Sequence, residues 1–551
     1  MRAAPALAAI CTSLLLVACA PGRRVAPPST DIDEDAYRNQ LSTLASDEFQ
    51  GRRPGTEGET RTVAYLVAEF RRLKLKPVSG DSYLQSVPMI EFTPDSVPTL
   101  TLSGRGPLIS LSAGRDMLIR SSHEQAELHL QGSDLVFAGY GVVAPEYGRD
   151  DYAGIDLHGK TVIVLSGDPG PAGAAALVAT LKVHMPGYFG RADYKIEEAA
   201  RRGADGVLLI HDAATTGISW DAIVNESGGA HLQRAVPDGA SPRPQLEGWL
   251  STDAGRALFA AAGLDFTASC KAASAGEFKA IRLGLRAEAT IRQSIRRFTS
   301  ANVVGVLPGA RYKGENIIYT AHWDQLGVRT SPAGAVMFLG AVDNASGVAG
   351  LLQLARSFTR TIPRPNRSIV FMATTGGEAN LAGSAYYVEN PLFSLQDTVA
   401  DLNLDTLHIG GPTRDVTVFG FGQSELEGYV RGAAALQGRE LHADPDPQLG
   451  TFYRSDNFSF AAHGVPALYA IGGTDDAARG PQWGRSQRED YFQHRYRRPD
   501  DVYSPDWDLR GTADDLRLYY RIGLVLAQGG RYPNWNRSSE FRDANAQERG
   551  G

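Results

Sequence analysis

Five polar side chains follow the ends of short apolar runs, and their types are those that bind metal ions. In chain order they are His322, Asp324, Asp343, Glu378 and Asp405. If the runs are neighbouring strands of a parallel sheet, their carboxyl ends meet at one edge, so side chains far apart in sequence can converge there. Imidazole and carboxylate groups together suit zinc. The sequence therefore predicts a zinc site.

Taken singly, each of these residues has an ordinary structural explanation. A strand-end Asp usually shapes a turn, and Asn344, next to Asp343, could cap the helix expected at residues 348–358. The placement of all five at the ends of such runs is what favours a metal site.

The elements that must position them lie in the second half of the chain. Apolar runs at residues 317–321, 368–373, 402–404 and 466–471 read as strands, with helices such as 348–358 between them. This alternation predicts a three-layer α/β domain with a mostly parallel sheet.

Upstream of this domain the pattern differs. One face of an amphipathic helix is formed by Val63, Leu66, Val67, Phe70 and Leu73. Between about residues 132 and 292 the chain changes to short β-branched runs at 135–137, 161–165 and 206–210, which predict a separate, β-rich inserted module. We refer to residues 132–292 as the inserted module.

The first residues have the features of an export signal. Arg2 precedes an apolar stretch, residues 3–18, that is too short to span a bilayer comfortably. Its end, Leu-Val-Ala-Cys, resembles the lipobox of bacterial lipoproteins, so Cys19 would be acylated and would anchor the protein in a membrane. Ala20 then suggests the outer membrane, facing the periplasm. The alternative is a plain signal peptide that is cut near the same place.

Composition excludes some classes of function. The 551 residues carry a formal net charge of -7 and no long basic run, so a nucleic-acid partner is not expected. Two of the three cysteines lie in the leader, which leaves Cys270 as an expected buried thiol. No G-x-S-x-G motif is present, so a serine esterase has no support.

Three segments resemble metallopeptidase family 28, the co-catalytic di-zinc aminopeptidases. They are residues 320–327 (Thr-Ala-His-Trp-Asp-Gln-Leu-Gly), 340–347 (Gly-Ala-Val-Asp-Asn-Ala-Ser-Gly) and 402–405 (Leu-Asn-Leu-Asp). Residues 44–58 are similar to the N-terminal region of that family. Within residues 137–212, the inserted module resembles the protease-associated domain found in some of its members.

The resemblance implies a role for each metal-binding residue. Asp343 would bridge two zinc ions, His322 and Asp405 would complete one site, and Glu378 with a distal histidine would complete the other. Asp324 would orient His322 from behind. The residue before Glu378 would be a glutamate that acts as general base.

Two positions depart from the family pattern. Gly377 stands at the general-base position, and Arg497 stands at the distal histidine position. A guanidinium offers only donors and cannot bind zinc. Either one zinc remains on His322, Asp343 and Asp405, with Arg497 pairing with Glu378 and Asp343 in place of the second ion, or catalysis is lost and the protein binds peptides or partners.

Three further residues, His494, His408 and Asp456, are weaker candidates for the site. His494 would need a shifted loop to reach the metal, and His408 would have to turn toward it. Asp456 matches a segment that shapes the substrate side. If the cleft has kept its geometry, the double substitution Gly377→Glu and Arg497→His should raise peptidase activity.

The expected organisation follows from these patterns. A signal peptide (1–18) and a tether (19–30) precede the first part of the peptidase domain (31–131). The inserted module (132–292) follows, then the part with the metal site (293–531) and a disordered tail (532–551). The expected substrate or ligand is a peptide.

Overall fold

The computed structural model describes residues 32–104, 106–145, 148–169, 184–236, 242–275, 278–331 and 334–542. The predicted leader, Cys19 and the tether lie outside these residues. None of the helices in the described ranges is long and apolar enough to cross a membrane.

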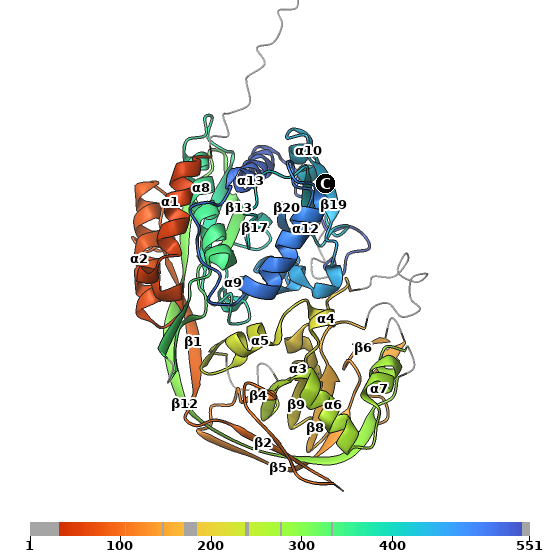
Figure 1. Ribbon diagram of the computed structural model, residues 1–551. Helices are drawn as coiled ribbons and strands as arrows, with labels where there is room; N and C mark the ends of the chain where they lie inside the picture. Colours follow the sequence, from red (N-terminus) through yellow and green to blue (C-terminus); the bar gives the residue numbers. More distant parts are fainter. Residues whose placement is uncertain are drawn as a thin grey trace, which may run out of the picture.

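Sixteen strands in the described ranges form one sheet that runs the whole length of the molecule (Figure 1). Along its main path the strands are β19 (Glu440–Ala443), β18 (Asp415–Phe419), β20 (Ala467–Gly472), β17 (Thr398–Asn403), β13 (Tyr312–His322), β16 (Arg367–Thr374), β12 (Ile281–Leu307), β5 (Glu127–Phe137), β8 (Lys160–Leu165), β9 (Gly206–Ile210), β11 (Leu246–Leu250) and β4 (Met117–Arg120). Strand β1 (Leu84–Pro94) pairs antiparallel with β12 and with β10 (His231–Arg234).

The upper half in Figure 1 has three layers. Strands β16, β13, β17 and β20 are parallel neighbours, and every residue of β16 and β17 is buried. Helices α1 (Glu34–Leu44), α8 (Gly347–Thr359) and α13 (Arg510–Gln528) contribute to the core on one face, while α11 (Asn457–Ala462) packs on the other. The predicted α/β fold with a mostly parallel sheet is confirmed.

Several local predictions agree with the structure. Helix α2 (Glu57–Arg72) buries Leu66 and Phe70. In α8 the apolar positions are buried, and the Asn344 side chain accepts a hydrogen bond from Gly347 N at 3.0 Å, as expected of a helix cap.

The lower half of the same sheet packs against a hydrophobic core of its own. Strands β5, β8, β9 and β11 are parallel, and helices α3 (Ala192–Arg201), α5 (Trp220–Ser227), α6 (Thr252–Ala261) and α7 (Phe266–Ala273) accompany them. It is therefore richer in helix than its sequence pattern suggested. Cys270 on α7 is only partly buried.

Both predicted boundaries of the inserted module fall inside strands. Residue 132 lies within β5, and residue 292 lies within β12, which continues for 27 residues from one half into the other. No linker separates the halves there, because one strand hydrogen-bonds to β5 below and to β16 above.

The C-terminal segment is also more ordered than predicted. Trp535 and Phe541 are buried, and their rings lie 4.8 Å apart against the core. The prediction of a disordered tail is wrong for residues 532–542. Burial of two large aromatic side chains offsets the conformational entropy that is lost when this segment becomes ordered. Residues 543–551 lie outside the described ranges.

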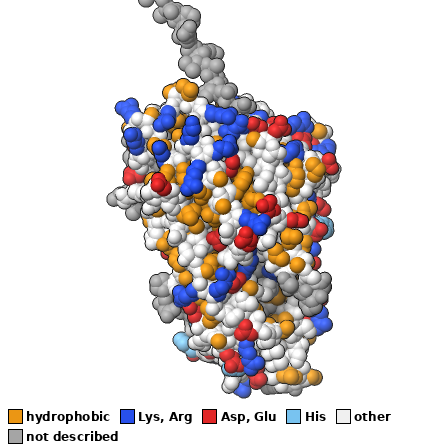
Figure 2. All heavy atoms as spheres, turned by 90° about the vertical axis from the view of Figure 1, so that its left-hand side faces the viewer, with side chains coloured by type: hydrophobic (Ala, Val, Ile, Leu, Met, Phe, Trp, Pro, Cys, Tyr) orange, Lys and Arg blue, Asp and Glu red, His pale blue; other side chains and the backbone are white. Residues whose placement is uncertain are grey.

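The side that carries α1 and α2 is shown in Figure 2. Lys and Arg side chains gather over its upper part, and hydrophobic side chains lie over its middle. The candidate site lies elsewhere, at the carboxyl ends of the parallel strands.

Candidate metal centre

Two neighbouring parallel strands and the turn before helix α8 bring the predicted ligands together. His322 is the last residue of β13, Asp405 follows β17 by two residues, and Asp343 lies in the turn before α8. The ligand atoms of these three residues lie within 4.8 Å of one another, and in the described ranges no other group of three or more His, Cys, Asp or Glu side chains meets this test.

The cluster is buried and its distances suit a bound cation. His322 Nε2 lies 3.2 Å from Asp343 Oδ1 and 3.5 Å from Asp405 Oδ1. Asp405 Oδ2 accepts a hydrogen bond from the Ser455 hydroxyl, whereas Asp405 Oδ1 is buried with no hydrogen-bond partner. A buried, unpaired carboxylate oxygen is costly, so this atom is suited to a metal ion.

His322 is oriented for ligation by Asp324, though mainly through the backbone. Its Nδ1 lies 3.2 Å from the Asp324 carbonyl oxygen and 3.6 Å from the Asp324 carboxylate. Because a carbonyl only accepts, Nδ1 carries a proton, and Nε2, which faces the two aspartates, is the atom that a metal ion would bind. The Asp324 carboxylate instead accepts from Gly377 N (2.8 Å) and Glu378 N (3.2 Å).

The electrostatics of the cluster favour a positive charge. Burial opposes protonation of His322, but the carboxylate of Asp405, followed by those of Asp324 and Asp343, raises the pKa of the imidazole well above its ordinary value. The pKa of Asp343 is lowered despite its burial, chiefly by its contact with His322. Proton and metal compete for this place, and the donor set fits zinc.

Asp501 holds the Asp343 turn in position. Its two carboxylate oxygens accept from Val342 N at 2.9 Å and from Asp343 N at 3.1 Å. Burial raises the pKa of Asp501 to about 7. Asp501 lies four residues after Arg497, and nothing in the sequence around it indicates this role.

The other half of the centre is occupied by an arginine. Arg497 Nη2 lies 2.8 Å from Glu378 Oε2, and Arg497 Nη1 pairs with Glu226 of helix α5. The expected pairing with Glu378 is therefore present, but the second partner is Glu226 instead of Asp343. Burial raises the pKa of Glu378 to about 8, although Arg497 opposes this. Sequence reasoning missed Glu226, since it belongs to the inserted module.

Gly377 lies against the imidazole. A Cβ atom built there would be 2.3 Å from His322 Cγ, a separation that real Cβ atoms do not show. No side chain fits at this position unless His322 moves. The position predicted for the general base thus has no room for a side chain.

The three alternative residues stay outside the cluster. His494 is 65% exposed and pairs with Asp490 at 3.1 Å. His408 lines a different cavity, where burial lowers its pKa. Asp456 is buried and accepts a hydrogen bond from the Thr374 hydroxyl at 2.6 Å.

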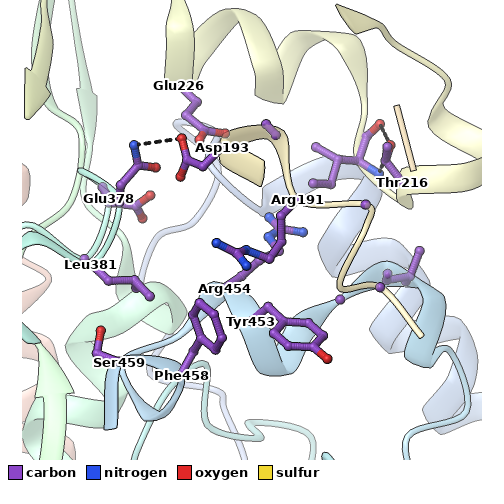
Figure 3. Close-up of a pocket in the computed structure, with 18 of the residues that line it drawn as sticks. Arg191, Asp193, Thr216, Glu226, Glu378, Leu381, Tyr453, Arg454, Phe458 and Ser459 are labelled. Atoms are coloured by element: carbon purple, nitrogen blue, oxygen red, sulfur yellow. Dashed lines mark hydrogen bonds between the residues drawn. The ribbon is translucent and has the colours of Figure 1, made fainter. Parts of the chain in front are cut away.

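A cavity of about 340 Å³ adjoins the cluster (Figure 3). Arg191 and Asp193 come from the inserted module, while Glu378, Arg454 and Phe458 come from the upper half. The Arg191 guanidinium lies over the Phe458 ring at 4.6 Å, and Asn380 donates to Asp193 at 3.3 Å. Both halves of the molecule therefore form the walls of one cavity.

Comparisons with known proteins agree with this geometry. Residues 302–520 match the family model of Peptidase family M28. Aminopeptidase NAALADL1 of Mus musculus is 33% identical over 206 residues, which cover 35% of this chain and 25% of that protein. BOS complex subunit NCLN of Homo sapiens is 33% identical over 169 residues, which cover 27% of this chain and 28% of that protein. The chain thus spans only about a quarter of the length of these relatives.

Among solved structures, an aminopeptidase from Aneurinibacillus sp. strain AM-1 superposes with a TM-score of 0.51 at 18% identity. The match covers 90% of this chain and 94% of that one, and at this identity it concerns the fold alone. Residues 302–520, which contain the cluster of His322, Asp343 and Asp405, thus match peptidase family M28 in sequence, and the chain shares the fold of a solved aminopeptidase.

Proposed function

We propose that the protein is a zinc-dependent hydrolase of the aminopeptidase type that works with one zinc ion and releases N-terminal residues from peptides. The observation that carries this proposal is the buried group of His322, Asp343 and Asp405, whose ligand atoms lie within 4.8 Å of one another. Three protein ligands with an open fourth position are typical of catalytic zinc.

Zinc at this place would supply Lewis acidity, which polarises a carbonyl group and makes water a stronger nucleophile at neutral pH. The chain's own residues hold the metal ligands in position. Ser455 and Asp501 fix the two aspartates, and the Asp324 carbonyl fixes the imidazole.

Arg497 is proposed to bind the substrate beside the metal. Its Nη atoms pair with Glu226 and Glu378, but its Nε is buried and has no hydrogen-bond partner in the described ranges. A donor of this kind suits a carbonyl oxygen that gains negative charge during hydrolysis.

A specific observation favours a second candidate, a protein that has lost catalysis and binds peptides or partners in the envelope. Gly377 provides no general base, and Glu378 is held by Arg497. Loss of a positioned base costs on the order of a hundred- to ten-thousand-fold in rate. One of the relatives above is named as a complex subunit instead of a peptidase.

We further propose that the inserted module is a protease-associated domain and that Cys19 carries a lipid anchor in the outer membrane, facing the periplasm. The leader pattern supports the anchor. Replacing Cys19 by serine is expected to move the protein from the membrane fraction to the soluble fraction.

The soluble Cys19→Ser protein allows the central test. We expect one zinc per chain by elemental analysis, and chelator-sensitive cleavage of amino-acyl anilides that is lost in His322→Ala. Two zinc ions per chain would contradict the one-metal site. One zinc without cleavage would support the non-catalytic candidate.

A further inference from the structure

A second cavity, of about 470 Å³, lies beside the metal centre and shares Glu378 and Glu226 with the first. One wall comes from the upper half, with Arg53, Asp324 and Arg329. The opposite wall comes from residues 228–232, between α5 and β10, and from Arg120 on β4. Since its lining includes Asp324 and Glu378, this cavity reaches the turn at residues 377–378, which lies against His322.

Arg329, on strand β14 (Gly327–Ser331), is a cation without a matching anion. No carboxylate of the described residues lies within 4 Å of its guanidinium, which donates to the Val224 carbonyl at 3.2 Å and lies over the Phe338 ring. Burial, with a smaller effect of Arg53, lowers the pKa of Arg329 to about 10, although Glu226 acts in the opposite direction, so the guanidinium remains charged at neutral pH. An unpaired charge in such a place favours binding of an anion.

The other two arginines of the cavity each share a carboxylate with a further arginine. Glu91 pairs with Arg53 at 2.8 Å and with Arg296 at 2.7 Å. Glu247 likewise pairs with Arg120 at 2.8 Å and with Arg243 at 3.7 Å. Neither carboxylate pairs with Arg329, which therefore has no ion-pair partner among the described residues.

His231 adds an unsatisfied polar group to the same cavity. It is only 5% exposed, and neither ring nitrogen makes a hydrogen bond. Burial, with Arg120 as the second cause, lowers its pKa to about 3, so the ring is neutral and can both donate and accept.

The acidic residues that face the cavity are already engaged. Glu226 and Glu378 pair with Arg497, and Asp324 accepts two backbone N–H groups. None of them pairs with Arg329 within 4 Å, and Glu226 acts on Arg329 only from a greater distance.

We propose that this cavity is a carboxylate-binding subsite, in which Arg329 is the main anchor for a carboxylate of a peptide held at the zinc site. The inference rests on the proposed function, since it supplies the substrate class. Guanidinium groups bind carboxylates with two parallel hydrogen bonds. The carboxylate comes either from the C-terminus of a short peptide or from an acidic side chain downstream of the cleaved bond.

The test is a binding titration with zinc-loaded Cys19→Ser protein at low salt, with Leu-Leu, Leu-Leu-amide, Leu-Glu-amide and glutarate as probes. We expect Leu-Leu to bind about tenfold or more tightly than its amide, the effect of one charge-assisted hydrogen bond. In Arg329→Gln this preference should vanish while the zinc content stays the same. The matched control is Arg286→Gln, an exposed arginine on β12 far from the cavity.

Each outcome decides a separate question. Tight binding of Leu-Glu-amide would identify a side-chain carboxylate as the ligand. Weak binding of Leu-Glu-amide would identify the C-terminal carboxylate of the peptide. Glutarate that binds in an Arg329-dependent manner, while no peptide binds, upholds the subsite and contradicts the proposed function. Equal binding of Leu-Leu and its amide, together with glutarate that does not need Arg329, overturns the subsite.

Discussion

At the scale of single residues, Gly377 decides what the metal centre can become. Because a Cβ at this position would lie 2.3 Å from His322 Cγ, the turn and the imidazole occupy space that a larger residue would need. A glutamate at position 377 would therefore require a shift of His322 in addition to the substitution itself.

We predict that Gly377→Ala weakens zinc binding about tenfold or more, since the added methyl group must displace a ligand. Chelator competition with purified protein measures the affinity. The control is Gly428→Ala on α10 (Leu426–Ala435), where an added Cβ meets no atom within 4 Å. Unchanged zinc affinity in Gly377→Ala would show that the turn yields easily.

The same contact changes the outcome expected for the restored site. From sequence alone, Gly377→Glu with Arg497→His should raise activity. With the imidazole in contact, we expect no gain over the parent protein in anilide cleavage.

Much of this centre could be predicted because its ligands follow strands with clear apolar patterns. His322, Asp343 and Asp405 are brought together as the parallel arrangement requires. Glu226 could not be predicted, since its approach to Arg497 depends on how the two halves of the molecule meet. Asp501 acts through backbone N–H groups, which leave no pattern in the side chains.

At the scale of elements, helix α3 carries a buried lysine. The Lys195 ammonium donates to the Tyr140 carbonyl, and the residue has no exposed surface. Burial lowers the pKa of Lys195 to about 7, although Asp168 and Asp151 act in the opposite direction. In an unfolded chain a lysine titrates near 10.4.

This difference predicts a pH dependence of stability. Between pH 7 and about 10, the unfolded chain binds a proton that the folded chain does not, so the free energy of unfolding rises with pH. Lys195 should contribute an increase of about 2 kcal/mol from pH 7 to pH 9. Urea unfolding at both pH values should show this increase in the parent and in Lys279→Met, an exposed control, but a smaller one in Lys195→Met.

Strands and helices with strong periodicity were predictable, whereas β12 was not recognised as one element. Its residues 281–291 alternate between exposed and buried, and residues 300–307 are all buried. The two patterns read as parts of different domains, although one strand carries both.

At the scale of the whole molecule, helix α5 docks the inserted module onto the metal-site loop. Arg498 donates to the Ser219 hydroxyl at 3.0 Å and pairs with Asp221 at 3.1 Å, while Asn225 donates to the Arg497 carbonyl at 3.1 Å. Arg497, which stands at the predicted position of the distal zinc ligand, thus lies in the contact between the two halves.

We predict that Arg498→Ala loosens this contact. A partly exposed ion pair contributes about 0.2–1 kcal/mol, so hydrogen exchange in α5 should become about two- to fivefold faster. Exchange in α6, which lies away from the contact, should stay unchanged. In the control variant Arg286→Ala, exchange should stay unchanged in both helices. Equal acceleration of both helices would indicate general destabilisation of the module.

Strand β12 also sets how far the two halves can move apart. At about 3.3 Å per residue, its 27 residues have a length along the strand of roughly 90 Å. Its register shifts lie at residues 282–289, whereas residues 293–307, which join the halves, pair without a break with β1 and β16. This stretch therefore lacks the sharp hinge that wide opening would need. We therefore expect the passage between the halves to widen only slightly, so that it admits the loose ends of peptide chains and excludes folded proteins on size alone.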